Sequence, residues 1–200
     1  MGGAFGAGKL NGRVAFPKPL AALGTTPISL HASLESEDLA GVTRQFGLGD
    51  ADLFTGEGAV LVNLALEGTP GQTMRTSLTA SLGDESVSYS GDITADAGEL
   101  SGNGRLDLAL ANGSGIPQAI GAQGIDLPPV AGSAGLSFDT SGLFALSDID
   151  ARSGEVPFTG DLGLTRVADS LAVSGNLALG SLSVEGLATA LLGQTAFAIA

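Results

Sequence analysis

The sequence has 200 residues with 44% apolar side chains, a mean hydropathy of +0.34 and 32 glycines, and this apolar content is enough to build a hydrophobic core. Its net charge of −13 opposes charge-driven binding to nucleic acid and to anionic bilayers, so no nucleic-acid partner is expected. The absence of cysteine excludes disulfides and Cys-based metal sites.

The sequence contains neither an uninterrupted apolar run of about 18 residues nor a basic leader followed by an apolar segment. Met1 leads directly into a glycine-rich run that is typical of the middle of a sheet. We therefore expect residues 1–200 to be one repetitive β segment of a longer polypeptide, with any membrane anchor outside it.

The first predicted elements in the chain are a helix and two strands. The helix spans about 36–46, with Ser36 as N-cap and Gly47 as its stop. Residues 87–93 and 100–110 alternate apolar and polar side chains with period two, which predicts half-buried antiparallel strands.

A tight turn at Ala97–Gly98 is expected to join these two strands, and it places Gly91 opposite Gly104 on the apolar face. Glycine inside a strand usually marks a bend or a close approach of another group. After these strands, residues 116–121 are predicted to form a single helical turn.

The second half of the chain predicts two further strands and a helix. Residues 156–164 and 171–179 repeat the period-two alternation, and 186–192 carries a leucine stripe typical of a short helix. Turns at Ser153–Gly154 and Val167–Ala168 are expected to join the strands of this half into a meander.

These turns align small residues on the apolar face of neighbouring strands. The predicted row consists of Ser147, Gly160 and Gly175, and it extends to Ala134 if Phe138 pairs with Leu143; Gly91 and Gly104 form a second small pair upstream. Small residues at matched positions allow a sheet to bend sharply. The predicted fold is therefore mainly β: a strongly curved, antiparallel, Gly-interrupted sheet, shaped as a U-shaped groove or β-solenoid, with two or three short helices.

The residues for catalysis and metal binding are sparse. His31 is the only histidine, and it falls on the polar phase of an alternating run, where a surface role is expected. A chain with no cysteine and one histidine lacks the side chains that zinc sites and Ser-His or Cys-His catalysis require. We therefore expect no metal, no cofactor and no enzymatic activity.

A short motif recurs in the strands: Ser or Thr, then Gly, then Asp or Asn, at 90–92, 159–161 and 174–176. In the last copy, Leu171–Leu179 is followed by the leucine-rich run 180–188. This unit resembles the repeating element of AsmA-like proteins, the bacterial envelope proteins related to AsmA and TamB. The resemblance extends over most of the chain.

The resemblance implies a periplasmic protein tethered to the bacterial inner membrane, with a hydrophobic β-groove that shields or conducts phospholipid acyl chains during outer-membrane biogenesis or envelope homeostasis. Its expected partners are these acyl chains and other envelope proteins. The residues expected to line the groove are Val60, Val62, Leu64, Leu106, Leu108, Phe158, Leu162, Val173 and Leu177. The alternative is a structural or adhesive surface β-protein with a closed, dry core and no lipid cargo.

Overall fold

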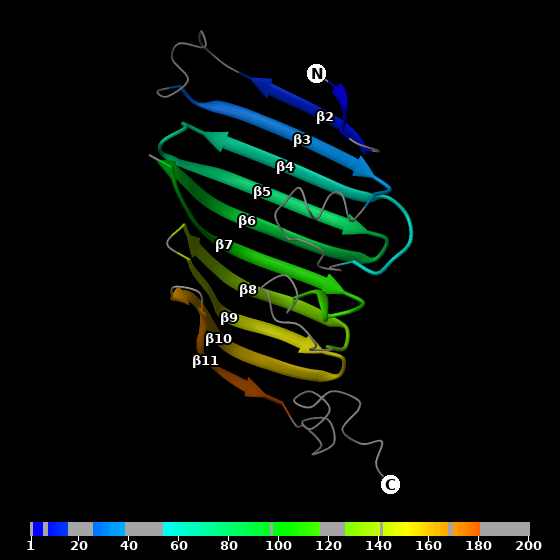
Figure 1. Cartoon of the computed structure of the whole chain (residues 1–200), viewed down its shortest axis with the longest axis vertical. Helices are drawn as coiled ribbons and strands as arrows, with labels where there is room; N and C mark the ends of the chain where they lie inside the picture. Colours follow the sequence, from blue (N-terminus) through cyan, green and yellow to red (C-terminus); the bar gives the residue numbers. More distant parts are fainter. Residues whose placement is uncertain are drawn as a thin grey trace.

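The structure, a computed structural model, describes residues 2–5, 8–15, 26–38, 54–96, 98–116, 127–140, 142–167 and 170–180. Eleven strands form one open sheet within these residues (Figure 1). The strands are β1 (Gly2–Phe5), β2 (Gly8–Ala15), β3 (Ile28–Ser36), β4 (Val60–Gly68), β5 (Thr73–Leu82), β6 (Glu85–Asp96), β7 (Glu99–Leu110), β8 (Val130–Asp139), β9 (Leu143–Ser153), β10 (Val156–Val167) and β11 (Ser170–Leu179).

The order of strands in the sheet is the order in the chain, and every pairing is antiparallel. Eleven strands spaced at about 4.8 Å span roughly 48 Å. Two-residue turns at Gly83–Asp84 and Gly154–Glu155 close two of the hairpins, and both glycines have φ of 59°, which a hairpin turn of this length requires. The prediction of a mainly β, antiparallel fold is confirmed.

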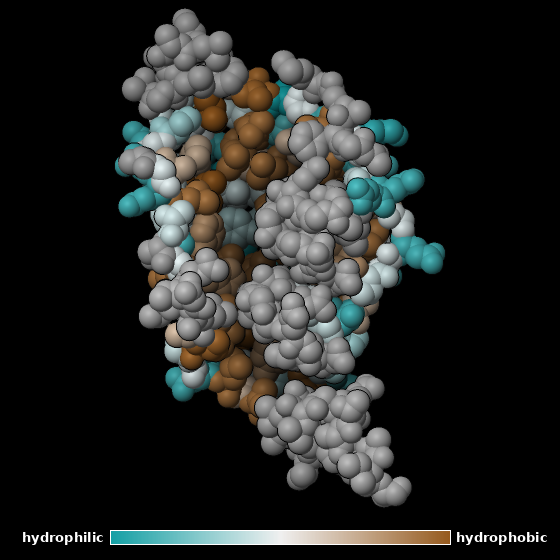
Figure 2. Space-filling model, viewed as in Figure 1, coloured by the Kyte–Doolittle hydropathy of each residue, from teal (hydrophilic) through white to brown (hydrophobic). Residues whose placement is uncertain are grey.

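Period-two alternation divides the sheet into an apolar face and a polar face. The register connects one apolar row across ten strands: Leu10, Leu34, Val62, Ala80, Val87, Leu108, Gly132, Ala151, Phe158 and Leu179. Figure 2 shows apolar side chains gathered along this face, with hydrophilic side chains at the two margins. A one-residue slip of any strand would reverse its faces, so the apolar pattern fixes which way each strand faces.

The best-buried part of the apolar face lies at one margin, where β4 begins, β5 turns into β6, and β7 ends (Figure 1). Its buried cluster consists of Leu34, Phe54, Val60, Val62, Leu82 and Leu110, with Ile116 packed against it. Phe54 and Ile116 come from the two long connections, β3–β4 and β7–β8, which both lie at this margin. The described parts of these connections, which include Phe54 and Ile116, therefore pack against the sheet at this margin.

The predicted two or three short helices are not borne out within the residues that the structure describes. Helical backbone there is confined to Gly115 and Ile116. Ser36 ends strand β3, although its Oγ does accept a hydrogen bond from the Asp38 backbone N–H at 3.1 Å, as an N-cap would. The rest of the first two predicted helices, and all of 186–192, lies outside the described residues.

Candidate functional site

The apolar face is the candidate functional surface because it brings together the residues predicted to line a groove. All nine lie on it: Val60, Val62 and Leu64 in β4, Leu106 and Leu108 in β7, Phe158 and Leu162 in β10, and Val173 and Leu177 in β11. The nine residues therefore share one face, and their role in lining a groove stays a prediction. What they contact in the cell is a separate question.

Their exposure differs along the sheet. Val60 and Val62 are 1% and 6% exposed because they belong to the covered cluster at the margin. Val173 and Leu177 are 62% and 48% exposed on the last strand. The remaining lining residues are half-buried. A ligand that binds this face would therefore reach β11 more readily than the start of β4.

The predicted row of small residues across β8–β11 does not form. Ala134 pairs with Leu106 in β7, and Ser147 pairs with Gly135 on the polar face. The cause is a β-bulge in β9: Asp148, with φ of 49°, is the extra residue, and it shifts the register against both neighbouring strands. The Asp148 N–H donates to Oδ1 of Asp161 at 3.1 Å, which holds the bulge in place.

The two glycines of the predicted row also have other partners. Gly160 lies opposite Ile149 in β9 and opposite Leu177 in β11, and Gly175 lies opposite Leu162. For these two glycines the pairing is shifted by two residues from the predicted one, so both keep their predicted face. A Cβ on Gly160 or Gly175 would collide with a backbone carbonyl of the neighbouring strand, so these glycines permit a close strand approach.

The pair Gly91–Gly104 forms as predicted, opposite each other in β6 and β7. A Cβ on Gly91 would lie 2.5 Å from the Cα of Gly104 and 2.8 Å from Oη of Tyr89, because the Tyr89 ring lies over both glycines. Phe138 covers Gly102 in the same way, with Cζ 2.6 Å from a Cβ placed there. These glycines therefore make room for aromatic rings on the apolar face.

Tyr89 is anchored on this face by its hydroxyl. The O–H lies 3.1 Å from the carbonyl oxygen of Asp92 and 3.0 Å from that of Asn103, and its ring meets Phe138 edge-on with centroids 6.2 Å apart. Burial, assisted by the negative charge of Asp92, raises the pKa of Tyr89. The phenol therefore stays neutral and fixes the ring as part of the sheet surface.

Glu85 is the unexpected residue on the apolar face. Although charged, it is 5% exposed, because Oε2 accepts the N–H groups of Thr55 and Gly56 at 2.7 and 2.9 Å. Oε1 accepts the N–H of Ala111 at 2.8 Å and lies 3.3 Å from the Thr55 hydroxyl. We call this arrangement the Glu85 clamp: one carboxylate fastens both long connections to the β5–β6 hairpin.

The sequence carried a signal for this residue. Glu85 has the same phase as Val87 and Tyr89, so alternation places a carboxylate on the apolar face, where it needs hydrogen-bond partners. Its three backbone partners lie 26–30 residues away in irregular segments, so spacing alone did not identify them.

The opposite face is lined with small, mostly uncharged polar side chains. One cross-strand row runs through Asn11, Ser33, Asn63, Thr79, Ser88, Asp107, Ser133, Asp150 and Thr159. A shallow open hollow of about 540 Å³ lies over β2–β5 on this face, and its lining includes His31 and Arg13. His31 is exposed, as predicted, and its Nε2 lies 3.2 Å from Oγ of Ser29.

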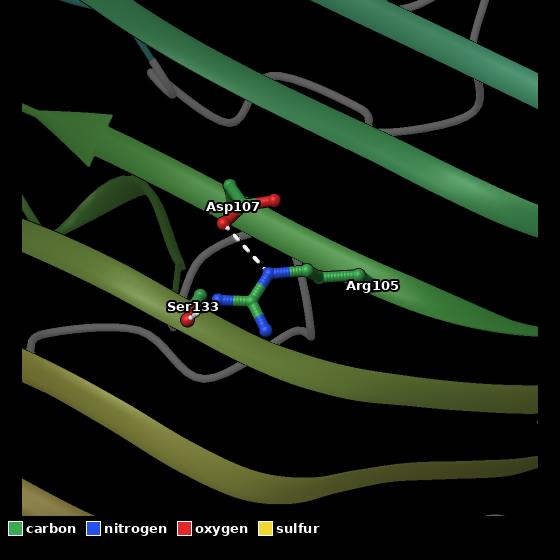
Figure 3. A network of polar contacts seen from close by, with 3 residues as sticks. All are labelled: Arg105, Asp107 and Ser133. Atoms are coloured by element: carbon green, nitrogen blue, oxygen red, sulfur yellow. Dashed lines mark hydrogen bonds and ion pairs between the residues drawn. The ribbon is translucent and has the colours of Figure 1, made fainter.

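Farther along the polar face, Arg105 joins two neighbouring strands (Figure 3). Its Nε lies 3.2 Å from Oδ1 of Asp107, and its Nη2 donates to Oγ of Ser133 at 2.5 Å. The Arg105 and Asp107 side chains are 62% and 49% exposed, so water screens the ion pair and its contribution to stability is small.

The described residues contain neither a metal-binding cluster nor a membrane-spanning helix. No group of three or more His, Asp or Glu side chains could hold a metal ion together. Likewise, no helix in the described part of the chain has the length and apolar character needed to cross a membrane.

Comparison of the chain with protein-family models, with curated proteins and with solved structures finds no match. The function is therefore inferred from the chemistry of the two sheet faces.

Proposed function

We propose that this chain is a non-enzymatic part of an AsmA-like bacterial envelope protein whose apolar sheet face shields or conducts phospholipid acyl chains. The observation that carries the proposal is the continuity of the apolar face across ten strands, opposite a face of small polar side chains. In this proposal the segment lies in the periplasm, tethered to the inner membrane by an anchor outside the sequence and in contact with other envelope proteins.

The chemistry of the face suits acyl chains. Burying methylenes gains about 0.8 kcal/mol each, so ten methylenes on this surface would contribute about 8 kcal/mol before ordering costs. In strands β4–β8 the one charged residue on this face is Glu85, and the clamp already satisfies it. An acyl chain on this face would therefore make apolar contacts along its length. It would meet no specific polar partner that stops it from sliding.

A crosslinking experiment in cells tests the proposed facing. A photo-reactive residue at Phe158 or Leu177 should capture phospholipid, because both side chains lie on the apolar face. The sequence neighbours Thr159 and Asn176 face the other way and serve as matched controls that should capture little. Equal capture on both faces, or capture only at the two controls, would refute the proposal.

Purification without detergent separates this proposal from the alternative of a structural or adhesive protein with a closed core. Native mass spectrometry of the lipid-shielding protein should show co-purified phospholipid. Absence of phospholipid from the purified protein, together with failed crosslinking at Leu177, would favour the closed core.

The proposal includes a finer architectural claim, that the sheet curves strongly around its apolar face to form a U-shaped groove. The bulge at Asp148 supports bending because a bulged strand kinks and twists locally. The small residues Gly91, Gly104, Gly160 and Gly175 add to it, because strands can approach closely where a side chain is missing.

Spin labels on Ser33 and Thr159 measure this curvature, since both residues are on the polar face, in β3 and β10. Seven strand spacings give about 34 Å between their backbones in a flat sheet. Strong curvature toward the apolar face should produce a distance that differs clearly from the flat value once the label lengths are included. A distribution centred on the flat value would remove the U shape from the proposal while leaving the facing intact.

A further inference from the structure

Strand β11 is the outer strand of the sheet, and within the described residues it pairs with β10 alone. The Gly180 N–H donates to the Pro157 carbonyl at 2.8 Å, which makes these two residues a hydrogen-bonded pair of the ladder. In an antiparallel ladder the bonded residues alternate, so the even-numbered residues of β11 direct their backbone groups toward β10. The N–H and C=O groups of the odd-numbered residues therefore point away from β10.

The same odd-numbered residues carry exposed apolar side chains. Val173, Leu177 and Leu179 are 62%, 48% and 49% exposed, and they extend the apolar face to the edge of the sheet. Within the part of the chain that the structure describes, this edge thus presents backbone groups without ladder partners and exposed aliphatic side chains at the same positions.

Strand β11 also differs in charge from the other long strands, β2–β10. Each of the strands β2–β10 contains at least one ionisable side chain, whereas β11 contains none and has no proline. Edge strands usually carry charges, prolines or bulges that prevent pairing with another chain. The edge of β11 has none of these features, so its composition favours pairing.

We propose that β11 is a self-association edge, where two copies of this chain pair antiparallel about a two-fold axis to make one continuous sheet. A register centred on Gly175 places Val173 opposite Leu177 of the second copy and Ser174 opposite Asn176 of the second copy. This register joins outward-pointing backbone groups and keeps the apolar faces on one side. The two chains, each with a net charge of −13, meet where neither has a charge.

A second copy fits better than an unrelated strand because the edge is complementary to itself. An isologous contact closes as a dimer, whereas pairing β11 with the opposite edge of another copy would continue into a fibre. The opposite edge strand, β1, has four residues, so it offers much less backbone than the ten residues of β11. The inference is independent of lipid binding and is tested without lipid.

Analytical ultracentrifugation of the 200-residue chain over a wide concentration range tests the proposal. A monomer–dimer equilibrium is expected, and Val173→Lys should raise its dissociation constant at least about tenfold, the factor that corresponds to about 1.4 kcal/mol. Val14→Lys is the matched control, because Val14 is a 46% exposed valine on the apolar face of β2 at the other side of the sheet. This control should leave the equilibrium unchanged.

A double cysteine variant keeps the proposal testable if Val173→Lys fails to fold. Because the chain has no cysteine, Ser174→Cys with Asn176→Cys should form disulfides between copies under mild oxidation. The side chains of residues i and i+2 in one strand point the same way, so their Cβ atoms lie about 6.6 Å apart, well beyond the Cβ separation of about 3.5–4.5 Å in a disulfide. A chain that stays monomeric at all concentrations, or that forms polymers weakened by Val14→Lys, would overturn the two-fold β11 edge.

Discussion

Replacing Glu85 with alanine is expected to lower the free energy of unfolding by about 3 kcal/mol. The change leaves the N–H groups of Thr55, Gly56 and Ala111 without their acceptor at a buried margin of the sheet. The three donor residues are themselves exposed, so water can partly replace the carboxylate, and each donor is expected to cost about 1 kcal/mol, the lower end of the usual range. Urea-induced unfolding followed by circular dichroism measures the loss.

Glu57→Ala is the matched control, since Glu57 belongs to the same connection and is exposed. Its effect should stay within about 0.5 kcal/mol. If the two alanine variants lose equal stability, the hydrogen bonds of the Glu85 clamp do not stabilise the contact between the two connections and the β5–β6 hairpin.

The pH dependence of Glu85→Gln gives a second readout for the clamp. Burial acts to raise the pKa of Glu85, but the hydrogen bonds from Gly56, Thr55 and Ala111 outweigh burial and hold this pKa below its ordinary value. A carboxyl with a lowered folded-state pKa contributes stability that is fully present above its unfolded pKa, about 4.3, and is lost as pH falls through the folded value.

The stability difference between the native sequence and Glu85→Gln should therefore be constant from neutral pH down to about pH 5.5 and shrink below about pH 4. Comparing the two proteins cancels the titration of the other acidic groups. A difference that grows with acidification would contradict the assigned direction of the pKa shift.

Gly91→Ala is expected to destabilise the sheet by about 3 kcal/mol, at the upper end of the cost of overpacking a well-packed site. The new Cβ would meet the Gly104 backbone at 2.5 Å and the hydroxyl of Tyr89 at 2.8 Å. Backbone atoms of a ladder cannot move without breaking hydrogen bonds, so β6 and β7 must separate or Tyr89 must leave its position. Thermal unfolding and the near-UV signal of the single tyrosine both report this change.

Gly12→Ala provides the comparison for Gly91→Ala. Gly12 is also inside a strand on the apolar face, but a Cβ there would meet only the carbonyl oxygen of His31, 3.9 Å away. This variant should be neutral or more stable by up to about 1 kcal/mol, because alanine restricts the unfolded chain more than glycine does. Equal losses for the two variants would show that glycine is needed for strand conformation rather than for the close contact.

Strand positions and facing could be predicted from the sequence because alternation records which side chains are buried. The turn at Ala97–Gly98 was predicted correctly, so the Gly91–Gly104 pair followed from it. The later turns were placed one residue early, and this error is invisible to alternation because a two-residue shift returns every side chain to the same face.

Two features could not be predicted from the alternation of apolar and polar side chains. The bulge at Asp148 depends on a hydrogen bond to Asp161 in the neighbouring strand, and it moved Ser147 to the polar face. The Glu85 clamp depends on backbone groups of irregular connections, whose positions no repeat in the sequence specifies. Both are contacts between residues distant in sequence, made by polar groups that need a particular geometry.

The sequential order of the strands affects how the sheet folds and how its width responds when strands are added or removed. Because each of the eleven described strands pairs only with its neighbours in the chain, the energetics resemble those of a linear array, in which nearest-neighbour terms add. Contacts close in sequence favour rapid folding and allow the ends to fray before the middle. Inserting or deleting a whole hairpin would lengthen or shorten the sheet by about 10 Å while preserving both faces.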